Sequence, residues 1–343
     1  MRKAFFVICP LLLLVLAFRS AETLFEKPSH FPEPLYAFGK KPVNSAQIQL
    51  GRALFYDPVL SRDSSQSCAS CHSPYNAFAH TDHALSHGIE DRIGTRNAPA
   101  LMNLAWQPIF MWDGAVNHLD VQALAPISNA LEMDENLPHV LSKLQHSTLY
   151  PALFKRAFGT NEITGERMLL ALAQFQLSLV SAGSKYDSVQ LGQSHFTEQQ
   201  QHGYTIFKQH CNSCHTEPLF TNYAFMNNGL APDTSLNDIG RMHLTQRASD
   251  SLKFKVPSLR NIEFTYPYMH DGRFNRLSEV LNHYTQGIQK SPTLAPQLNQ
   301  LLPLNSVDRV DLIAFLLTLS DRRFLFDPSH AYPKDLFAGK PTH

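Results

Sequence analysis

Two copies of one five-residue pattern hold almost all the cysteine in this chain. The sequence CASCH runs from Cys68 to His72, and CNSCH runs from Cys211 to His215. The fifth cysteine, Cys9, lies in an apolar N-terminal run. Paired thiols followed by an imidazole can bind a metal, form a disulfide or hold a haem, so the spacing has to choose between these chemistries.

The spacing of the pairs favours covalent haem. A structural zinc site usually draws on two cysteine pairs about 15–20 residues apart, whereas these pairs lie in different halves of the chain. A thioredoxin-like dithiol belongs beside a βαβ pattern, and a disulfide within either motif would leave the trailing histidine unexplained. In a haem c site both thiols bind the porphyrin and the adjacent histidine binds the iron. The sequence therefore predicts two haem c groups, one on Cys68, Cys71 and His72, the other on Cys211, Cys214 and His215.

Two haems permit two classes of function. In an electron carrier both irons are coordinatively saturated, whereas in an enzyme one iron keeps an open position for peroxide or oxygen. The residues around each iron have to decide between them. Composition excludes one further class, because Lys+Arg and Asp+Glu both number 29 and give no basic surface for nucleic acid.

The predicted fold is all-α, with two cytochrome c-like domains that each carry one haem. At 343 residues and 43% hydrophobic content the chain is long enough for two cores. Each half repeats the order of a helix, the cysteine motif, and then loops rich in Pro, Gly and Asn. A boundary at 184–196 separates an N-terminal domain, 44–190, from a C-terminal domain, 195–328.

Helix signals frame both domains. Asn44 or Ser45 can cap a helix that runs to about Phe55, and Thr164 precedes a long, largely apolar helix. Thr197 caps a helix that leads into the second motif, and Ser306 caps a helix near the end of the chain. In this last helix we expect one buried stripe, made of Val307, Val310, Ile313 and Leu317.

The N-terminus resembles an export signal. Arg2 and Lys3 precede an apolar stretch from Ala4 to Phe18. This stretch is shorter than the roughly 20 residues of a membrane span. Ala21 is the candidate cleavage site, although Arg19 fits it badly. We expect residues 1–21 to be a signal peptide for the periplasm, with an uncleaved N-terminal anchor as the alternative.

The stretches between and after the motifs resemble a known family. GTRNAPALMNLAW, MWDGAVNHL and APISNALEM are similar to the N-terminal domain of bacterial di-haem cytochrome c peroxidases and MauG proteins. FKVPSLRNIEFTYPYMHDG and LSEVLNHYTQG are similar to the C-terminal domain. The resemblance covers residues 44 to 325. It implies that peroxide reacts at the N-terminal haem and that the C-terminal haem receives electrons.

The resemblance also implies roles for individual residues. Glu132 of ALEM matches the distal acid–base, a role that a carboxylate within reach of bound peroxide can perform. Pro126 matches a proline of the same pocket, and Trp112 matches the tryptophan that relays electrons between the haems. A calcium ion would bind the side-chain oxygen of Asn97 and the backbone carbonyls of Thr265 and Pro267, because oxygen ligands suit this ion.

Two departures place the chain near the MauG subclass. Reductively activated members close the peroxide iron with a distal histidine, and aligning SHG with their Ser-x-Gly puts Ile89 at that position. His87 is the competing ligand in a shifted loop. At the other haem Tyr284 takes the place of the usual methionine, with His283 as its competitor. A phenolate lowers the potential relative to methionine.

These expectations add up to an exported di-haem peroxidase that reacts without reductive activation. Its partners would be hydrogen peroxide and a small electron donor, a cytochrome c or a cupredoxin. The donor could instead be a protein side chain, which would make the reaction a cofactor maturation. A non-enzymatic di-haem carrier is the alternative class, and the chain is a candidate homodimer.

Overall fold

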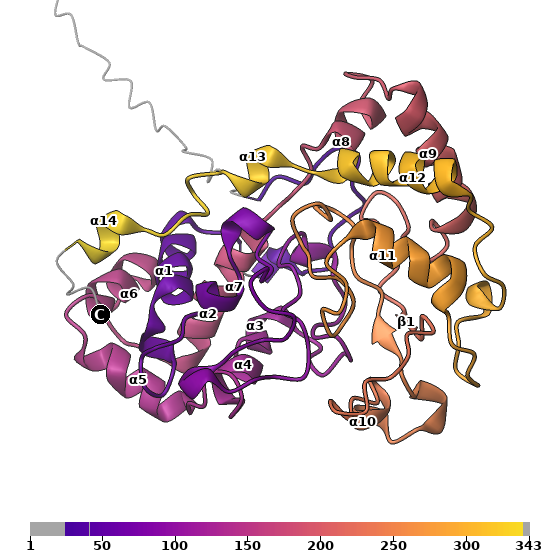
Figure 1. Ribbon diagram of the computed structural model, residues 1–343. Helices are drawn as coiled ribbons and strands as arrows, with labels where there is room; N and C mark the ends of the chain where they lie inside the picture. Colours follow the sequence, from indigo (N-terminus) through magenta and orange to yellow (C-terminus); the bar gives the residue numbers. More distant parts are fainter. Residues whose placement is uncertain (1–24, 41, 339–343) are drawn as a thin grey trace, which may run out of the picture.

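The computed structural model describes residues 25–40 and 42–338 (Figure 1). The predicted export segment, residues 1–21 with Cys9 and the apolar run from Ala4, therefore lies outside the described residues. Across the described ranges, no helix is both long and apolar enough to cross a membrane. Helices dominate what is described, as the sequence predicts, and the two named strands are two residues long and pair antiparallel.

Eight α-helices form the first part of the chain. They are α1 (Ser45–Tyr56), α2 (Cys68–Cys71), α3 (Leu119–Gln122), α4 (Leu124–Ser128), α5 (Leu137–His146), α6 (Tyr150–Phe158), α7 (Gly165–Ser178) and α8 (Lys185–Gln190). The predicted caps hold, because Asn44 accepts hydrogen bonds from Ala46 and Gln47, and Thr164 caps α7. Long loops join these helices, and the loops rather than the helices supply most of the site.

The second part contains six helices and both strands. They are α9 (Glu198–His210), α10 (Met242–Thr245), α11 (Leu277–Asn282), α12 (Ser306–Leu316), α13 (Arg322–Leu325), α14 (Lys334–Phe337), β1 (Phe225–Met226) and β2 (Phe254–Lys255). Thr197 caps α9 as predicted. The cap of α12 is Asn305, one residue before the predicted Ser306, because the Asn305 carboxamide accepts from the amides of Val307 and Asp308.

Each half has one close helix crossing that only glycine permits. A Cβ on Gly51 of α1 would lie 1.9 Å from the carbonyl oxygen of Ala171 in α7. A Cβ on Gly203 of α9 would lie at the same 1.9 Å from the carbonyl oxygen of Asp311 in α12. The helix before each haem motif thus crosses a later helix of its own half at backbone contact. The two halves share this kind of crossing, and their division into two related domains stays a prediction.

The predicted buried stripe on α12 is wrong. Val307, Val310 and Leu317 are 61%, 56% and 41% exposed. The buried positions are instead Asp311, Leu312, Phe315 and Leu316. The crossing at Gly203 explains the error, because it presses the Asp311 side of α12 against α9 and turns the valines outward.

The C-terminal tail returns to the first half of the molecule. Phe324, Leu325 and Phe337 pack in the same core as α1 and α7. In Figure 1, α13 and α14 run from the end of α12 back toward α1. A second core gathers Phe207, Phe220 and Phe315 around α9 and α12. One core therefore lies near each cysteine motif, and α13 and α14 pack against the first of these cores.

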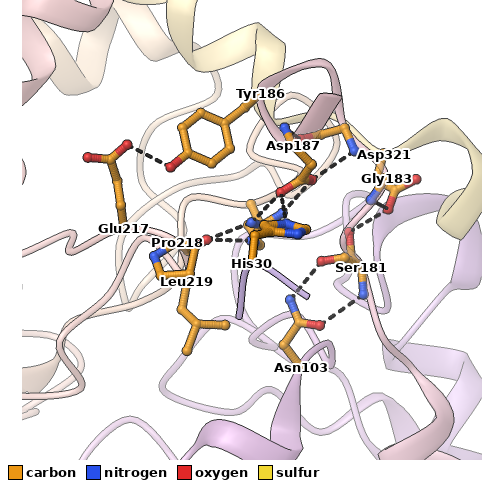
Figure 2. A network of polar contacts seen from close by, with 12 residues as sticks. His30, Asn103, Ser181, Gly183, Tyr186, Asp187, Glu217, Pro218, Leu219 and Asp321 are labelled. Atoms are coloured by element: carbon orange, nitrogen blue, oxygen red, sulfur yellow. Dashed lines mark hydrogen bonds and ion pairs between the residues drawn. The ribbon is translucent and has the colours of Figure 1, made fainter. Parts of the chain in front are cut away.

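A buried ion pair ties the two halves together at Asp187. The Asp187 carboxylate accepts two hydrogen bonds from Arg260, at 2.9 and 2.8 Å, and lies 2.7 Å from His30 Nε2. Arg260 is fully buried, and Asp187 is 1% exposed. Figure 2 shows Asp187 beside His30, with the neighbouring hydrogen bonds of Asn103 to Ser181. Burial alone would raise the pKa of Asp187, but the hydrogen bonds and charge of Arg260 hold it at about 2.

Replacing Asp187 by Asn should destabilise the protein strongly. The change leaves the Arg260 guanidinium buried without its counter-charge, a loss that costs about 3–5 kcal/mol. Because the native pKa lies below the unfolded value of about 3.9, the ion pair stabilises the protein fully above about pH 4 and loses this effect as the pH falls toward 2. The D187N variant should unfold at lower denaturant and lose this part of the acid dependence.

The matched control is Glu33→Gln. Glu33 pairs with Lys27 at 2.6 Å, but its side chain is 83% exposed, so its removal should cost less than about 1 kcal/mol. Equal effects of the two substitutions in urea unfolding would contradict the assigned role of Asp187.

Candidate haem and peroxide site

The first cysteine motif forms one helical turn with a tethered histidine behind it. Cys68 and Cys71 begin and end α2, and His72 follows at its C-cap. The Nδ1 of His72 lies 2.6 Å from the carbonyl oxygen of Phe78. Burial lowers the pKa of His72 to about 4, with the Phe78 carbonyl opposing the shift. The imidazole is therefore neutral, with its proton on Nδ1 and the lone pair of Nε2 available.

The second motif repeats this arrangement directly after α9. Cys211 is the C-cap residue of α9, and the His215 Nδ1 lies 3.2 Å from the Phe220 carbonyl oxygen and 3.1 Å from that of Pro257. Burial lowers the pKa of His215 to about 4 as well. Both histidines thus have the tautomer and the charge state that an iron ligand needs.

The donor set fits two haem c groups. All four cysteines of the motifs are free thiols, so neither motif is closed by a disulfide. Each thiol pair lies beside a neutral histidine whose Nδ1 already donates a hydrogen bond to a backbone carbonyl. Cys68 and Cys71 with His72, and Cys211 and Cys214 with His215, would hold the two haems.

Glu132 lies on the loop after α4, close to the first thiol pair. Burial raises the pKa of Cys68 to about 12 and also raises that of Cys71, and the charge of Glu132 adds to both shifts. Burial also raises the pKa of Glu132 itself, although a 2.8 Å hydrogen bond from the Asn129 amide to Oε1 opposes this. Pro126, within α4, supports the same loop, because its carbonyl accepts from the amide of Met133 at 3.2 Å.

The two candidates for the residue that faces the first haem are arranged differently. Ile89 is fully buried, and its amide donates to the carbonyl of Glu132 at 2.8 Å. The His87 ring stacks on His83 with centroids 4.1 Å apart, and its Nδ1 pairs with Asp91 at 2.8 Å. Ile89 is thus packed beside the distal acid, whereas the His87 ring already has partners of its own.

Trp112 bridges the two halves of the chain. Its indole N–H donates to the backbone carbonyl of Asn97 at 2.9 Å, and its own carbonyl accepts from the amide of Lys255 in β2 at 2.7 Å. Asn97 in turn donates its amide to the carbonyl of His270 at 2.7 Å. The indole therefore lies where backbone from both halves meets, as an inter-haem relay would require.

Tyr284 lies in a π-helical turn, His283–Gly287, that continues α11. Burial raises the pKa of Tyr284 to about 12, the Asn228 amide opposes this, and Cys211 and Cys214 add to it. The phenol is thus near the second thiol pair. The competing His283 has its Nε2 3.0 Å from the carbonyl oxygen of Asn228. Such π-turns often occur at functional sites.

The predicted calcium site would use oxygen atoms of Asn97, Thr265 and Pro267. Asn97 is buried, and its side-chain nitrogen donates to the carbonyl of Ala84 at 2.9 Å, which leaves Oδ1 as the amide atom able to bind a cation. Thr265 and Pro267 flank a cis peptide bond between Tyr266 and Pro267. Among the described residues, no group of three or more His, Cys, Asp or Glu could hold a metal ion. Calcium binding stays a prediction, and it rests on the side-chain oxygen of Asn97 and the backbone carbonyls of Thr265 and Pro267 rather than on carboxylates.

Sequence reasoning missed the residues that hold the site in place. Nothing in the motifs points to the carbonyls of Phe78, Phe220 and Pro257, because a backbone acceptor leaves no trace in residue type. It also missed Asn129 and Asn228, which contact Glu132 and Tyr284. Asn129 could have been suspected from its place three residues before the acid, but Asn228 is far from Tyr284 in sequence.

Comparison with known proteins agrees with this site. A family model described as di-haem cytochrome c peroxidase matches residues 45–195. The methylamine utilization protein MauG of Methylorubrum extorquens is 36% identical over 307 residues, which cover 86% of this chain and 83% of the relative. The cytochrome c551 peroxidase of Nitrosomonas europaea is 34% identical, over 81% of each chain.

A solved structure extends the likeness to the whole fold. The crystal structure of a MauG-like protein associated with microbial copper homeostasis superimposes with a TM-score of 0.79 at 29% identity. It covers 90% of this chain and 98% of that one. The similarity thus extends over most of both chains. This chain belongs to the di-haem cytochrome c peroxidase and MauG family.

Proposed function

We propose that this protein is a di-haem peroxidase that accepts hydrogen peroxide with both haems ferric. The observation that carries the proposal is the pairing of Ile89 with Glu132: a buried side chain without a lone pair lies hydrogen-bonded through its backbone to the loop of the distal acid. An isoleucine cannot bind iron, so this arrangement leaves the N-terminal iron open. Reductive displacement of a ligand is then unnecessary.

Glu132 would move the protons of the reaction. Reduction of one peroxide to two waters consumes two electrons and two protons, and one proton must pass from the inner to the leaving oxygen. Asn129 occupies Oε1 of Glu132, so Oε2 is the atom assigned to this transfer. The raised pKa of Glu132 brings the carboxyl closer to the working pH, where a group can both accept and return a proton.

The second haem and Trp112 would deliver the electrons. When bound, the two haem irons supply the redox chemistry and store oxidising equivalents. Trp112 lies in backbone contact with both halves, and Tyr284 would bind the second iron as an anionic oxygen ligand. The electrons come from a small cytochrome c or cupredoxin. The MauG relatives favour a second donor class, a protein side chain oxidised in a maturation reaction.

The Glu132→Gln variant should lose peroxide reactivity by about 10²- to 10⁴-fold, because glutamine cannot transfer the proton. In the parent protein the rate should also fall as the pH drops through the raised pKa of Glu132, since the base is then protonated. This acid limb should vanish in E132Q. Stopped-flow mixing of the ferric protein with peroxide over a pH series measures both effects.

Glu166→Gln is the matched control, because Glu166 lies in the first turn of α7 as an ordinary helix acid. If E132Q reacts with peroxide at the parent rate, Glu132 is not the acid–base of the reaction; if neither the parent nor the variant reacts, the protein is a di-haem electron carrier.

The all-ferric protein should show a high-spin haem in its EPR spectrum and react promptly with stoichiometric peroxide. The Ile89→His variant should convert this haem to a low-spin, six-coordinate form and require one electron before it reacts. If the parent protein is entirely low-spin and silent until reduced, a ligand such as His87 closes the iron and the open-site proposal is wrong.

Tyr284→Met should raise the reduction potential of the C-terminal haem, because a neutral thioether stabilises ferrous iron relative to a phenolate. Spectroelectrochemical titration measures the shift. His283→Gln is the control, since the His283 Nε2 already contacts the Asn228 carbonyl. A potential that moves with His283 and not with Tyr284 would assign the ligand to the histidine.

A further inference from the structure

Four ion pairs link three segments: the turn that carries Ile89, the loop that carries Glu132, and the segment that contains Arg62. Arg62 binds Glu90 and Asp134, each at 2.5 Å. Arg92 binds the same two carboxylates, with 2.8 Å to Asp134. The four residues Arg62, Glu90, Arg92 and Asp134 thus form a closed ring of alternating charge, which we call the distal latch. The haem motifs contain none of them, and the catalytic scheme above uses none of them.

Backbone contacts run parallel to the ion pairs. Arg92 also donates to the carbonyl of Ala130 at 2.8 Å, and the amide of Arg62 donates to the carbonyl of Met133 at 2.9 Å. These carbonyls flank Glu132 on both sides. On the facing turn, a Cβ on Gly88 would lie 2.2 Å from the carbonyl oxygen of Leu131. The latch therefore holds two backbones at a separation that only glycine permits.

The turn inside the latch has a conformation that its own residues disfavour. Glu90 and Asp91 have φ values of 54° and 55°, and the amide of Arg92 donates back to the carbonyl of Ile89 at 3.1 Å. Two successive left-handed residues are usual for Asn-Gly or Asp-Gly, and a glutamate at the first of these positions is not. Such a backbone persists when its surroundings hold it in place. Here the Glu90 carboxylate forms ion pairs with both Arg62 and Arg92.

Ordinary surface ion pairs would not justify a functional role. Isolated exposed pairs contribute little, and the four side chains here are 25–53% exposed. The distal latch differs in three respects. It is a network and not a single pair, it joins three separate segments, and two of those segments carry the proposed distal acid Glu132 and the buried Ile89.

We propose that the distal latch positions Glu132 and keeps the Ile89 turn closed over the N-terminal haem. Arg62 and Arg92 are its positioning residues. With the latch intact, Ile89 stays against the Glu132 loop, and His87 stays on Asp91 and His83. With the latch broken, the turn relaxes, Glu132 loses its fixed place, and the His87 imidazole becomes free to reach the iron. This inference rests on the proposed open-site function and names what maintains it.

The test uses the holoprotein with Arg62→Gln and Arg92→Gln combined. Hydrogen exchange of the peptide covering residues 86–94 should quicken about 10-fold, because the Ile89 amide loses its protected bond to Glu132. The peroxide rate should fall about 10- to 100-fold, since a small misplacement of a catalytic group has this effect. Part of the ferric high-spin haem should become low-spin, and adding His87→Ala should restore the high-spin form without restoring the rate.

Three further variants complete the test. Arg62→Lys with Arg92→Lys keeps the charge and should recover part of both the rate and the exchange protection. Arg167→Gln is the control, because Arg167 pairs with Glu162 at 3.0 Å outside the latch. If the double glutamine variant does not fold, Glu90→Gln weakens the same network while both arginines keep Asp134.

The outcomes separate the two proposals. Unchanged exchange in residues 86–94 together with an unchanged spin state in the latch variant would overturn the latch, even if the parent protein reacts with ferric haems as proposed. A parent protein that is low-spin and unreactive would overturn the open-site function. Faster exchange in the latch variant would then still show that the network closes the turn, so the hydrogen-exchange arm decides the latch in either case.

Discussion

The hydrogen bond between each motif histidine and a backbone carbonyl is the contact on which the rest of the site depends. A buried imidazole could be protonated, or could carry its proton on either nitrogen, and only the neutral form with its proton on Nδ1 leaves Nε2 free to bind iron. Burial keeps His72 and His215 neutral, and their Nδ1–H groups donate to the carbonyls of Phe78, Phe220 and Pro257. The loops after each motif are therefore part of the haem site as much as the cysteines are.

Backbone contacts at Trp112 join the two halves where the relay is proposed. The indole N–H of Trp112 donates to the carbonyl of Asn97, and the backbone carbonyl of Trp112 accepts from the amide of Lys255. Lys255 also extends its ammonium to the carbonyl of Ile109 at 3.0 Å. Backbone contacts of this kind do not depend on the identity of the side chains and are not screened by salt. They suit a relay whose distance to both haems must stay constant.

The region proposed to react with peroxide is built in the opposite way, from charged side chains at the surface. Arg92 pairs with Asp134 across the two loops, and Arg62, from a third segment, pairs with both Glu90 and Asp134. Between these loops lie Ile89 and Glu132. A site that admits peroxide needs an opening, and charged groups can line an opening where apolar packing would fill it. The cost is a dependence on ionic strength that the buried Asp187–Arg260 pair does not share.

Sequence alone determined the haem motifs, the family and the helices with strong local signals. The motifs could be recognised because covalent attachment requires a fixed short spacing, and the caps Asn44, Thr164 and Thr197 because capping is a local interaction. Only the tertiary structure decided which face of α12 is buried, since the Gly203 crossing overrides the apolar pattern of Val307 and Val310. It alone revealed the carbonyls that orient the histidines, the Asn228 contact with Tyr284, and the distal latch. The carbonyls of Phe78 and Phe220 are near in sequence but leave no trace in residue type, whereas Pro257, the Asn228 contact and the Arg62 and Asp134 pairs of the latch join residues far apart in the chain. Neither composition nor spacing records which backbone or distant side chain a residue will meet.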